Sequence, residues 1–309
     1  MQHVPMSLGR RPHGRRGFTM VELLVALVLL GLVSAALYRV LANNQRLYMA
    51  QTQRIDLSQN IRAAGNILPA EFRELDASEG DIIAMSATSI TIRAQRWLSF
   101  VCQIPVLGGA SWNGLSMIVR GGQTGQKGFY GSRGIQNTDS LLIYWDGDQT
   151  IRTDDYWPVG GVVNAVAGNC PDVPPTPGTV LTFNASSNPV AFATANKLGA
   201  ITLGAPVRGW ERVTYSLQQN AADGQWYLYM QPFGQTAQPL IGPLLSNGLS
   251  LSYFTTAGAV TAVPAQVARI DITVRGRTRN AIRKGGQAAA QVAVDSIVTS
   301  VALRNNRRF

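Results

Sequence analysis

The stretch Arg15-Arg16-Gly17-Phe18-Thr19-Met20-Val21-Glu22-Leu23-Leu24 opens a long apolar run. Residues 18–38 of this run carry one charge, that of Glu22. At a rise of ~1.5 Å per residue, a helix over this run is ~31 Å long, which is enough to cross a bilayer core of ~30 Å. The arginines before the run predict that the N-terminus stays in the cytoplasm and that the rest of the chain is exported.

Glu22 is the unusual residue of the run. A carboxylate inside a membrane-spanning segment costs roughly 2.5–3.5 kcal/mol on insertion scales, so such a residue is a functional-site candidate by default. A simple anchor would insert more favourably without it. A segment that finds a partner inside the membrane can use it, because a buried charge attracts a counter-charge.

The segment resembles the prepilin signature of type IV pilins and of type II secretion pseudopilins. The resemblance implies that a prepilin peptidase cuts after Gly17, that Phe18 is then N-methylated, and that Glu22 is needed for assembly with other pilin or pseudopilin subunits. Cleavage would leave an ammonium group on Phe18, four residues from Glu22. Pairing of one subunit's amine with another's Glu22 would offset the cost of burying both charges.

Two other interpretations of the run stay open. The first is a conventional secretory signal, with an apolar region at 23–33 and a cleavage site among Ser34, Ala35 and Ala36. The second is an uncleaved anchor. Glu22 has no role in either one.

Composition favours sheets and loops over a helical bundle. Of the 309 residues 46 % are apolar and 14 % charged, with 31 glycines and 15 prolines. The net charge of +10 is unevenly distributed: residues 1–17 hold four arginines and no acid, and residues 269–309 hold nine basic and two acidic residues. The part between them is therefore close to neutral.

The distribution of histidine limits the chemistry. Both histidines, His3 and His13, lie in the leader, so a processed chain has none. This excludes Ser-His-Asp and Cys-His catalysis as well as zinc or haem sites built on histidine. We expect no enzyme, no metal site and no cofactor. A glycosidase with two carboxylates is the one hydrolase that this argument leaves open.

The two cysteines, Cys102 and Cys170, are expected to form a disulfide in an oxidising compartment. The alternative is a pair of unpaired, buried cysteines. A disulfide here would close a long loop, which is worth ~4 kcal/mol in the chain-entropy model.

The helix is predicted to continue beyond the membrane. Residues 39–68 lack proline, and Leu57, Ile61, Ala64 and Leu68 form an apolar stripe at helical spacing. A bend is expected around residues 49–52, and Pro69 should end the helix or start a new turn. We therefore expect an α+β, pilin-like fold, divided into a leader 1–17, a membrane or filament-core helix 18–38, an amphipathic continuation 39–70 and a β-rich extracytoplasmic domain 71–309.

Strand patterns follow Pro69. Residues 81–85 and 89–93 are predicted to form a hairpin, and so are residues 212–219 and 225–231, across a turn with suitable residues. Further strands are expected at 116–120, 139–145, 180–183, 249–255 and 267–275, and residues 292–304 are expected to form either one last strand or two short ones. The remainder of 103–137 and of 168–199 is predicted to be mostly loop, because glycine and proline are frequent there.

Four other patterns suggest sites, and each has a simpler explanation that we favour. The glycine-rich run 121–128 lacks the Gly-Lys-Ser/Thr ending of a phosphate-binding loop, and four aspartates do not match a calcium loop. An aromatic group is expected to pack in the core instead of binding sugar. A basic C-terminal end could bind DNA, but charges that protect a sheet edge explain it better. These residues are Asp146, Asp148, Asp154 and Asp155 for calcium; Tyr144, Trp145, Tyr156 and Trp157 for the aromatic group; and Arg275, Arg277, Arg279, Arg283, Lys284, Arg304, Arg307 and Arg308 for the basic end.

The chain is also similar to PilW-like and GspJ-like minor subunits, through residues 62–65 (Arg-Ala-Ala-Gly), a late strand at 267–275 and an ending at 301–305. This resemblance implies a minor pilin or pseudopilin, held in the inner membrane by one span and later part of a periplasmic pseudopilus or a cell-surface pilus. The alternative function is a secreted or membrane-anchored β-rich binding protein with a conventional signal peptide.

Overall fold

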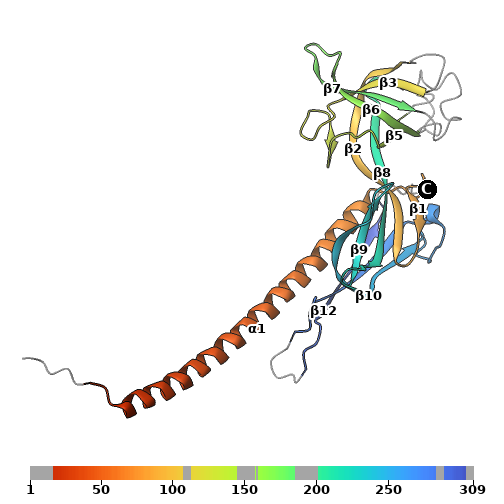
Figure 1. Ribbon diagram of the computed structural model, residues 1–309. Helices are drawn as coiled ribbons and strands as arrows, with labels where there is room; N and C mark the ends of the chain where they lie inside the picture. The colour runs from red at the N-terminus through yellow and green to blue at the C-terminus, as the bar shows by residue number, and fades with distance from the viewer. Residues whose placement is uncertain are drawn as a thin grey trace, which may run out of the picture. The chain divides into compact units, whose positions relative to one another are not determined.

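A computed structural model describes residues 17–106, 113–144, 157, 159–184, 201–282 and 289–303. The chain divides into two compact units, Met1–Arg54 and Ile55–Phe309. One helix, α1 (Met20–Arg73), runs from the first unit into the second (Figure 1). The described part of the first unit is the start of this helix and the three residues before it.

The second unit is built from the end of α1 and from antiparallel strands. Their bounds are β1 Ile82–Met85, β2 Ser89–Val106, β3 Asn113–Arg120, β4 Tyr130–Gly131, β5 Ser140–Ile143, β6 Val159–Cys170, β7 Thr176–Asn184, β8 Pro206–Gln219, β9 Trp226–Pro232, β10 Gln238–Phe254, β11 Arg269–Arg277 and β12 Val294–Ala302. A short 3₁₀ helix, η2 (Pro264–Gln266), precedes β11.

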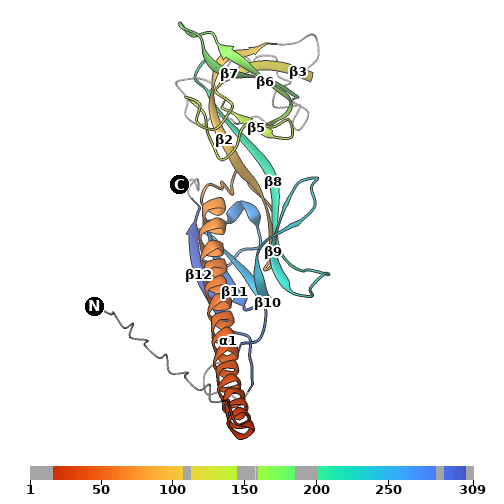
Figure 2. The same cartoon turned by 60° about the vertical axis from the view of Figure 1, so that its left-hand side comes forward.

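Seven strands form the sheet that carries the helix. Their order is β1-β2-β8-β9-β10-β11-β12, and every pair is antiparallel. The predicted stripe of α1 is buried against this sheet, together with Phe72. Figure 2 shows α1 alongside β11 and β12. Small residues allow this approach: a Cβ on Gly276 of β11 would lie 2.7 Å from Leu57 Cδ1, and one on Gly65 would lie 2.5 Å from Ile297 Cδ1.

Six strands close into a ring. β2 pairs with β3, β3 with β7, β7 with β6, β6 with β5, β5 with β8, and β8 with β2 again. The ring has its own core, in which Trp97 stacks on Phe129 with ring centroids 5.9 Å apart. A ring of so few strands leaves room inside only for side chains. Gly209 is required beneath Trp97, because a Cβ there would lie 1.9 Å from the indole.

The two long strands β2 and β8 belong to both parts of this unit. Ile90 and Ile92 of β2 lie in the core under α1, whereas Trp97 and Val101 lie in the core of the ring. Figure 1 shows both strands running from one group of strands into the other. The pairing of β2 with β8 is interrupted once, between Gln95 and Trp97, where Arg96 is the extra residue of a β-bulge.

Arg96 connects the helix to the ring through buried charges. Its guanidinium donates to Glu71 of α1, with Nη1 2.9 Å from Oε1, and to Glu211 of β8. Arg133 also donates to Glu211, at 3.4 Å, and to Asp139, at 2.6 Å. These side chains are 0–23 % exposed, so the network lies largely out of water.

The α+β fold class and both predicted hairpins are confirmed. The prediction for Pro69 is wrong: the proline is buried inside α1, which ends at Arg73 and is unbroken at residues 49–52. The prediction of loop is wrong at 103–106, 113–115, 168–170 and 176–179, which lie in strands, but it is confirmed for most of 121–137 and for 171–175. β2 extends through residue 106, and β6 and β7 occupy much of 159–184, because glycines and prolines are accommodated in the strands of the ring.

Candidate assembly motif at the start of the helix

Three residues of the signature lie immediately before the helix. Gly17, Phe18 and Thr19 are extended or irregular, and α1 begins at Met20. The side chain of Phe18 is 84 % exposed. A Cβ on Gly17 would meet no atom within 4 Å, and no positive φ requires glycine there. The described structure therefore gives no steric reason for a glycine at this position.

Thr19 and Glu22 form a capping box. The Glu22 amide donates to Thr19 Oγ1 at 3.2 Å, and the Thr19 amide donates to Glu22 Oε2 at 3.4 Å. These two bonds satisfy backbone N–H groups that the first turn of a helix leaves without partners. The negative carboxylate also lies at the positive end of the helix dipole. Glu22 thus has a local structural role as well as its unusual position in an apolar run.

This capping role of Thr19 is not among the features predicted above. The pattern Ser/Thr-x-x-Glu before an apolar run is the recognised signal of a capping box, and Thr19-Met20-Val21-Glu22 matches it. Thr19 is therefore a capping residue that could have been found without the structure.

The first half of α1 is apolar on all sides. Every residue from Met20 to Leu41 is exposed, including thirteen leucines and valines between 21 and 41 that are at least 50 % exposed. A helix of this kind is stable when it lies in a membrane or is covered by other helices. It is the one helix among the described residues that is long and apolar enough to cross a bilayer.

Cys102 and Cys170 are joined by a disulfide with Cα atoms 5.5 Å apart. Cys102 lies on β2 and Cys170 at the end of β6, so the bond links strands of the ring that are not neighbours. Both cysteines are buried, and Gly178 of β7 leaves space for the sulfur of Cys170. The disulfide fixes one end of the ring.

The other sites suggested by sequence are not assembled in the described residues. The run 121–128 connects β3 to β4, so it lacks the helix that a phosphate-binding loop precedes. Arg275 and Arg277 share the open face of β11, while Arg279 lies past its end and donates to Tyr227 at 3.4 Å. Among the described residues there is no group of three or more His, Cys, Asp or Glu that could hold a metal ion.

Some of those residues lie outside the part of the chain that is described. They are Trp145, Asp146, Asp148, Asp154, Asp155, Tyr156, Arg283, Lys284, Arg304, Arg307 and Arg308. Of the aromatic group, Tyr144 and Trp157 are in edge-to-face contact, with ring centroids 5.3 Å apart, and Arg208 covers Trp157. This contact is ordinary packing.

Comparison with known proteins returns one family model, the prokaryotic N-terminal methylation motif, which matches residues 12–38. No curated protein and no solved structure gives a significant match to the chain. The matched residues include Gly17, Phe18 and Glu22 and extend through the apolar half of the helix. The chain therefore carries, at residues 12–38, the N-terminal methylation motif that is the signature of type IV prepilins and pseudopilins.

Proposed function

We propose that the chain is a minor subunit of a type IV pilus or of a type II secretion pseudopilus. One observation carries the proposal: the methylation motif coincides with the start of a 54-residue helix that is apolar on all sides at first and buried on a β-sheet later. Such a helix suits a protein that is stored in a membrane and then packed against copies of the same kind of helix. The sheet and the ring then lie outside the membrane.

The proposal includes processing as a prepilin. Prepilin peptidase removes residues 1–17, and the new amine of Phe18 is methylated. Among the described residues nothing requires a glycine at position 17 for steric reasons, which supports this, because the glycine then serves recognition by the peptidase. Before assembly the subunit crosses the inner membrane once with its N-terminus in the cytoplasm, since Arg10, Arg11, Arg15 and Arg16 precede the span.

Glu22 has a role in assembly in addition to its capping role. A carboxylate has two oxygens and about four acceptor positions, so it can hold the Thr19 amide and still accept from a neighbouring subunit's amine. In lipid, that pairing removes an isolated charge from each partner. The pairing therefore favours the addition of a subunit whose Phe18 amine has been freed by cleavage after Gly17.

The intact mass and the N-terminal sequence of the protein from membranes of its native host test the processing step. We expect a chain that begins at Phe18 and carries one added methyl group. A chain that begins near Leu37 would show a conventional signal peptide, and an uncut chain would show a plain anchor. Either of these results would overturn the proposal.

Three variants separate the charge of Glu22 from its capping role. Glu22→Gln keeps a side chain that can complete a capping box but has no charge, whereas Thr19→Ala weakens the cap and keeps the charge. We expect Glu22→Gln to fail in filament assembly as completely as Glu22→Ala, and Thr19→Ala to assemble. Membrane levels of each variant provide the control for insertion. Normal assembly of Glu22→Gln would contradict the role of charge.

A further inference from the structure

A cavity of about 830 Å³ lies where β8 changes partners. Residues 207–210 of β8 pair with β5 of the ring, and residues 213–219 pair with β9 of the helix-bearing sheet. Between these two pairings, the strand is flanked by the segment before β5 and by the turn after β9. The volume is in the range of about 300–1,000 Å³ that is typical of small-molecule sites.

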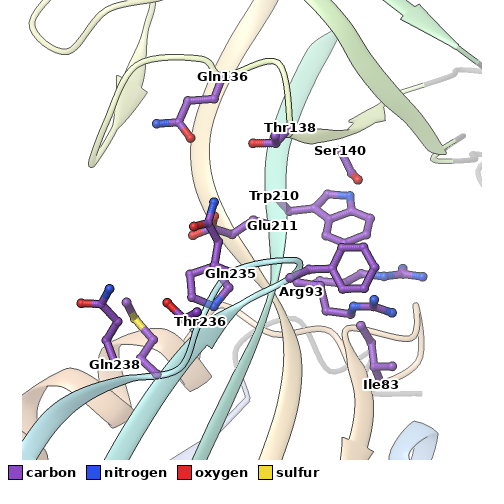
Figure 3. Close-up of a pocket in the computed structure, with 14 residues that line it drawn as sticks. Ile83, Arg93, Gln136, Thr138, Ser140, Trp210, Glu211, Gln235, Thr236 and Gln238 are labelled. Carbon is purple, nitrogen blue, oxygen red and sulfur yellow. The ribbon is translucent and has the colours of Figure 1, made fainter.

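The wall of this cavity is rich in groups that both donate and accept hydrogen bonds. It includes three primary amides and three hydroxyls, those of Gln136, Gln235, Gln238, Thr138, Ser140 and Thr236. Figure 3 shows Gln136, Thr138 and Ser140 on one side and Gln235, Thr236 and Gln238 on the other, with Trp210 and Glu211 of β8 between them. Groups of this kind match sugar hydroxyls, which also donate and accept.

Two aromatic rings add apolar surface to the same wall. They are Trp210 of β8 and Phe233 of the turn after β9, and Phe233 is 72 % exposed. Trp210 Nε1 is buried and has no hydrogen-bond partner among the described residues. Aromatic surface beside convergent polar groups is the composition expected of a site for a ligand with both apolar and polar faces.

Arg212 supplies a positive charge to the cavity. Its guanidinium stacks on Phe233, 3.5 Å from the ring centroid, and it has no carboxylate partner among the described residues. Stacking holds the guanidinium in place, while its N–H groups, which lie in the guanidinium plane, stay available for a carboxylate. Glu211, the one acid among the described residues of the wall, is already held by Arg96 and Arg133. The charge available to a ligand is therefore positive.

From these features we infer that the cavity binds an acidic oligosaccharide, with the carboxylate of a sugar ring on Arg212 and its hydroxyls on the surrounding amides and hydroxyl groups. This binding site is separate from the methylation motif, and it does not depend on whether the chain enters a pilus or a pseudopilus. A neutral oligosaccharide would leave Arg212 without its counter-charge, and an acidic peptide would use few of the paired donor and acceptor groups.

Calorimetric titration of the full-length protein tests this inference. The protein is held in a detergent without a sugar headgroup and titrated with trigalacturonic acid, with the methyl ester of that trisaccharide, and with triglutamate. We expect the acid to bind about tenfold or more tightly than the ester, because the ester lacks the charge that Arg212 recognises. We also expect triglutamate to bind more weakly than the trisaccharide.

Variants locate the site. Arg212→Gln should weaken binding of trigalacturonic acid by about tenfold or more. Arg208→Gln is the matched control, since Arg208 lies on the same strand, also stacks on an aromatic ring and does not line the cavity. Gln235→Ala, in an exposed turn, should weaken binding without affecting folding. The inference is overturned by absence of binding to the wild type, by equal affinity for the ester, by tighter binding of triglutamate, or by unchanged binding in both Arg212→Gln and Gln235→Ala.

Discussion

Asp139 provides a sharp test of how the ring is held to the rest of the β-rich unit. Its side chain is 0 % exposed, just before β5. It accepts hydrogen bonds from Trp97 Nε1 at 2.8 Å, from Arg133 at 2.6 and 3.0 Å, and from the Gln136 amide at 2.9 Å. Both carboxylate oxygens accept hydrogen bonds from Arg133. An asparagine at this position would therefore place its own NH₂ group, a donor, against an N–H donor of Arg133.

Asp139→Asn keeps the shape of the side chain and removes the charge that compensates Arg133. Breaking a buried ion pair typically costs ~3–5 kcal/mol of unfolding free energy. For a domain of about 150–250 residues, 1 kcal/mol lowers Tm by roughly 2–4 °C, so we expect a fall of about 6–20 °C. Calorimetric melting of the full-length protein in detergent measures it.

Asp172→Asn is the matched control. Asp172 is also paired with one arginine, Arg120, which lowers the pKa of Asp172 to about 2, but the two side chains are 32 % and 38 % exposed. Water replaces much of this exposed interaction, so we expect a much smaller fall in Tm. If Asp139→Asn melted within about 2 °C of the wild type, or no lower than Asp172→Asn, the reasoning from burial would be refuted.

Two further predictions concern the same unit. Burial raises the pKa of Asp81 to about 6, so the folded protein favours the protonated form of this carboxyl. The stability that the protonated carboxyl contributes is fully present below about pH 4 and is lost as the pH rises through 6. The total loss of unfolding free energy is ~3 kcal/mol. Denaturant midpoints between pH 4 and 7 should therefore fall less in Asp81→Asn than in the wild type, and equal slopes would contradict the assignment. Replacing both Cys102 and Cys170 by serine should reduce the unfolding free energy by ~4 kcal/mol, because the bond closes a loop with a sequence separation of 68. Urea denaturation measures this, and an unchanged midpoint would show that the disulfide contributes nothing.

Local patterns were enough to predict the helix and the late strands. The stripe from Leu57 to Leu68 has the period of a helix, and the alternation of residues 269–275 is reproduced in the burial of β11. The signature around Gly17 also lies within a few residues, so the methylation motif could be recognised from it. Each of these features depends on neighbours in the sequence.

The ring could not be predicted in the same way. Its closure depends on β2 meeting β8, whose residues are separated by about a hundred positions, and no short pattern encodes that pairing. Glycines lowered the expectation of strands there, although Gly209 and Gly178 are needed where Trp97 and Cys170 approach the backbone. The cavity beside Arg212 was missed for the same reason, since its wall is assembled from segments far apart in the sequence.

The sharing of β2 and β8 has a consequence for a protein that is pulled. Tension between the helix-bearing sheet and the ring would run along these two strands, while the hydrogen bonds that join them lie across it. Because both strands continue through both parts, load in that direction is carried by two covalent backbones and does not open the hydrogen bonds between them one after another from an end. The link between the two cores is therefore built to resist stretching.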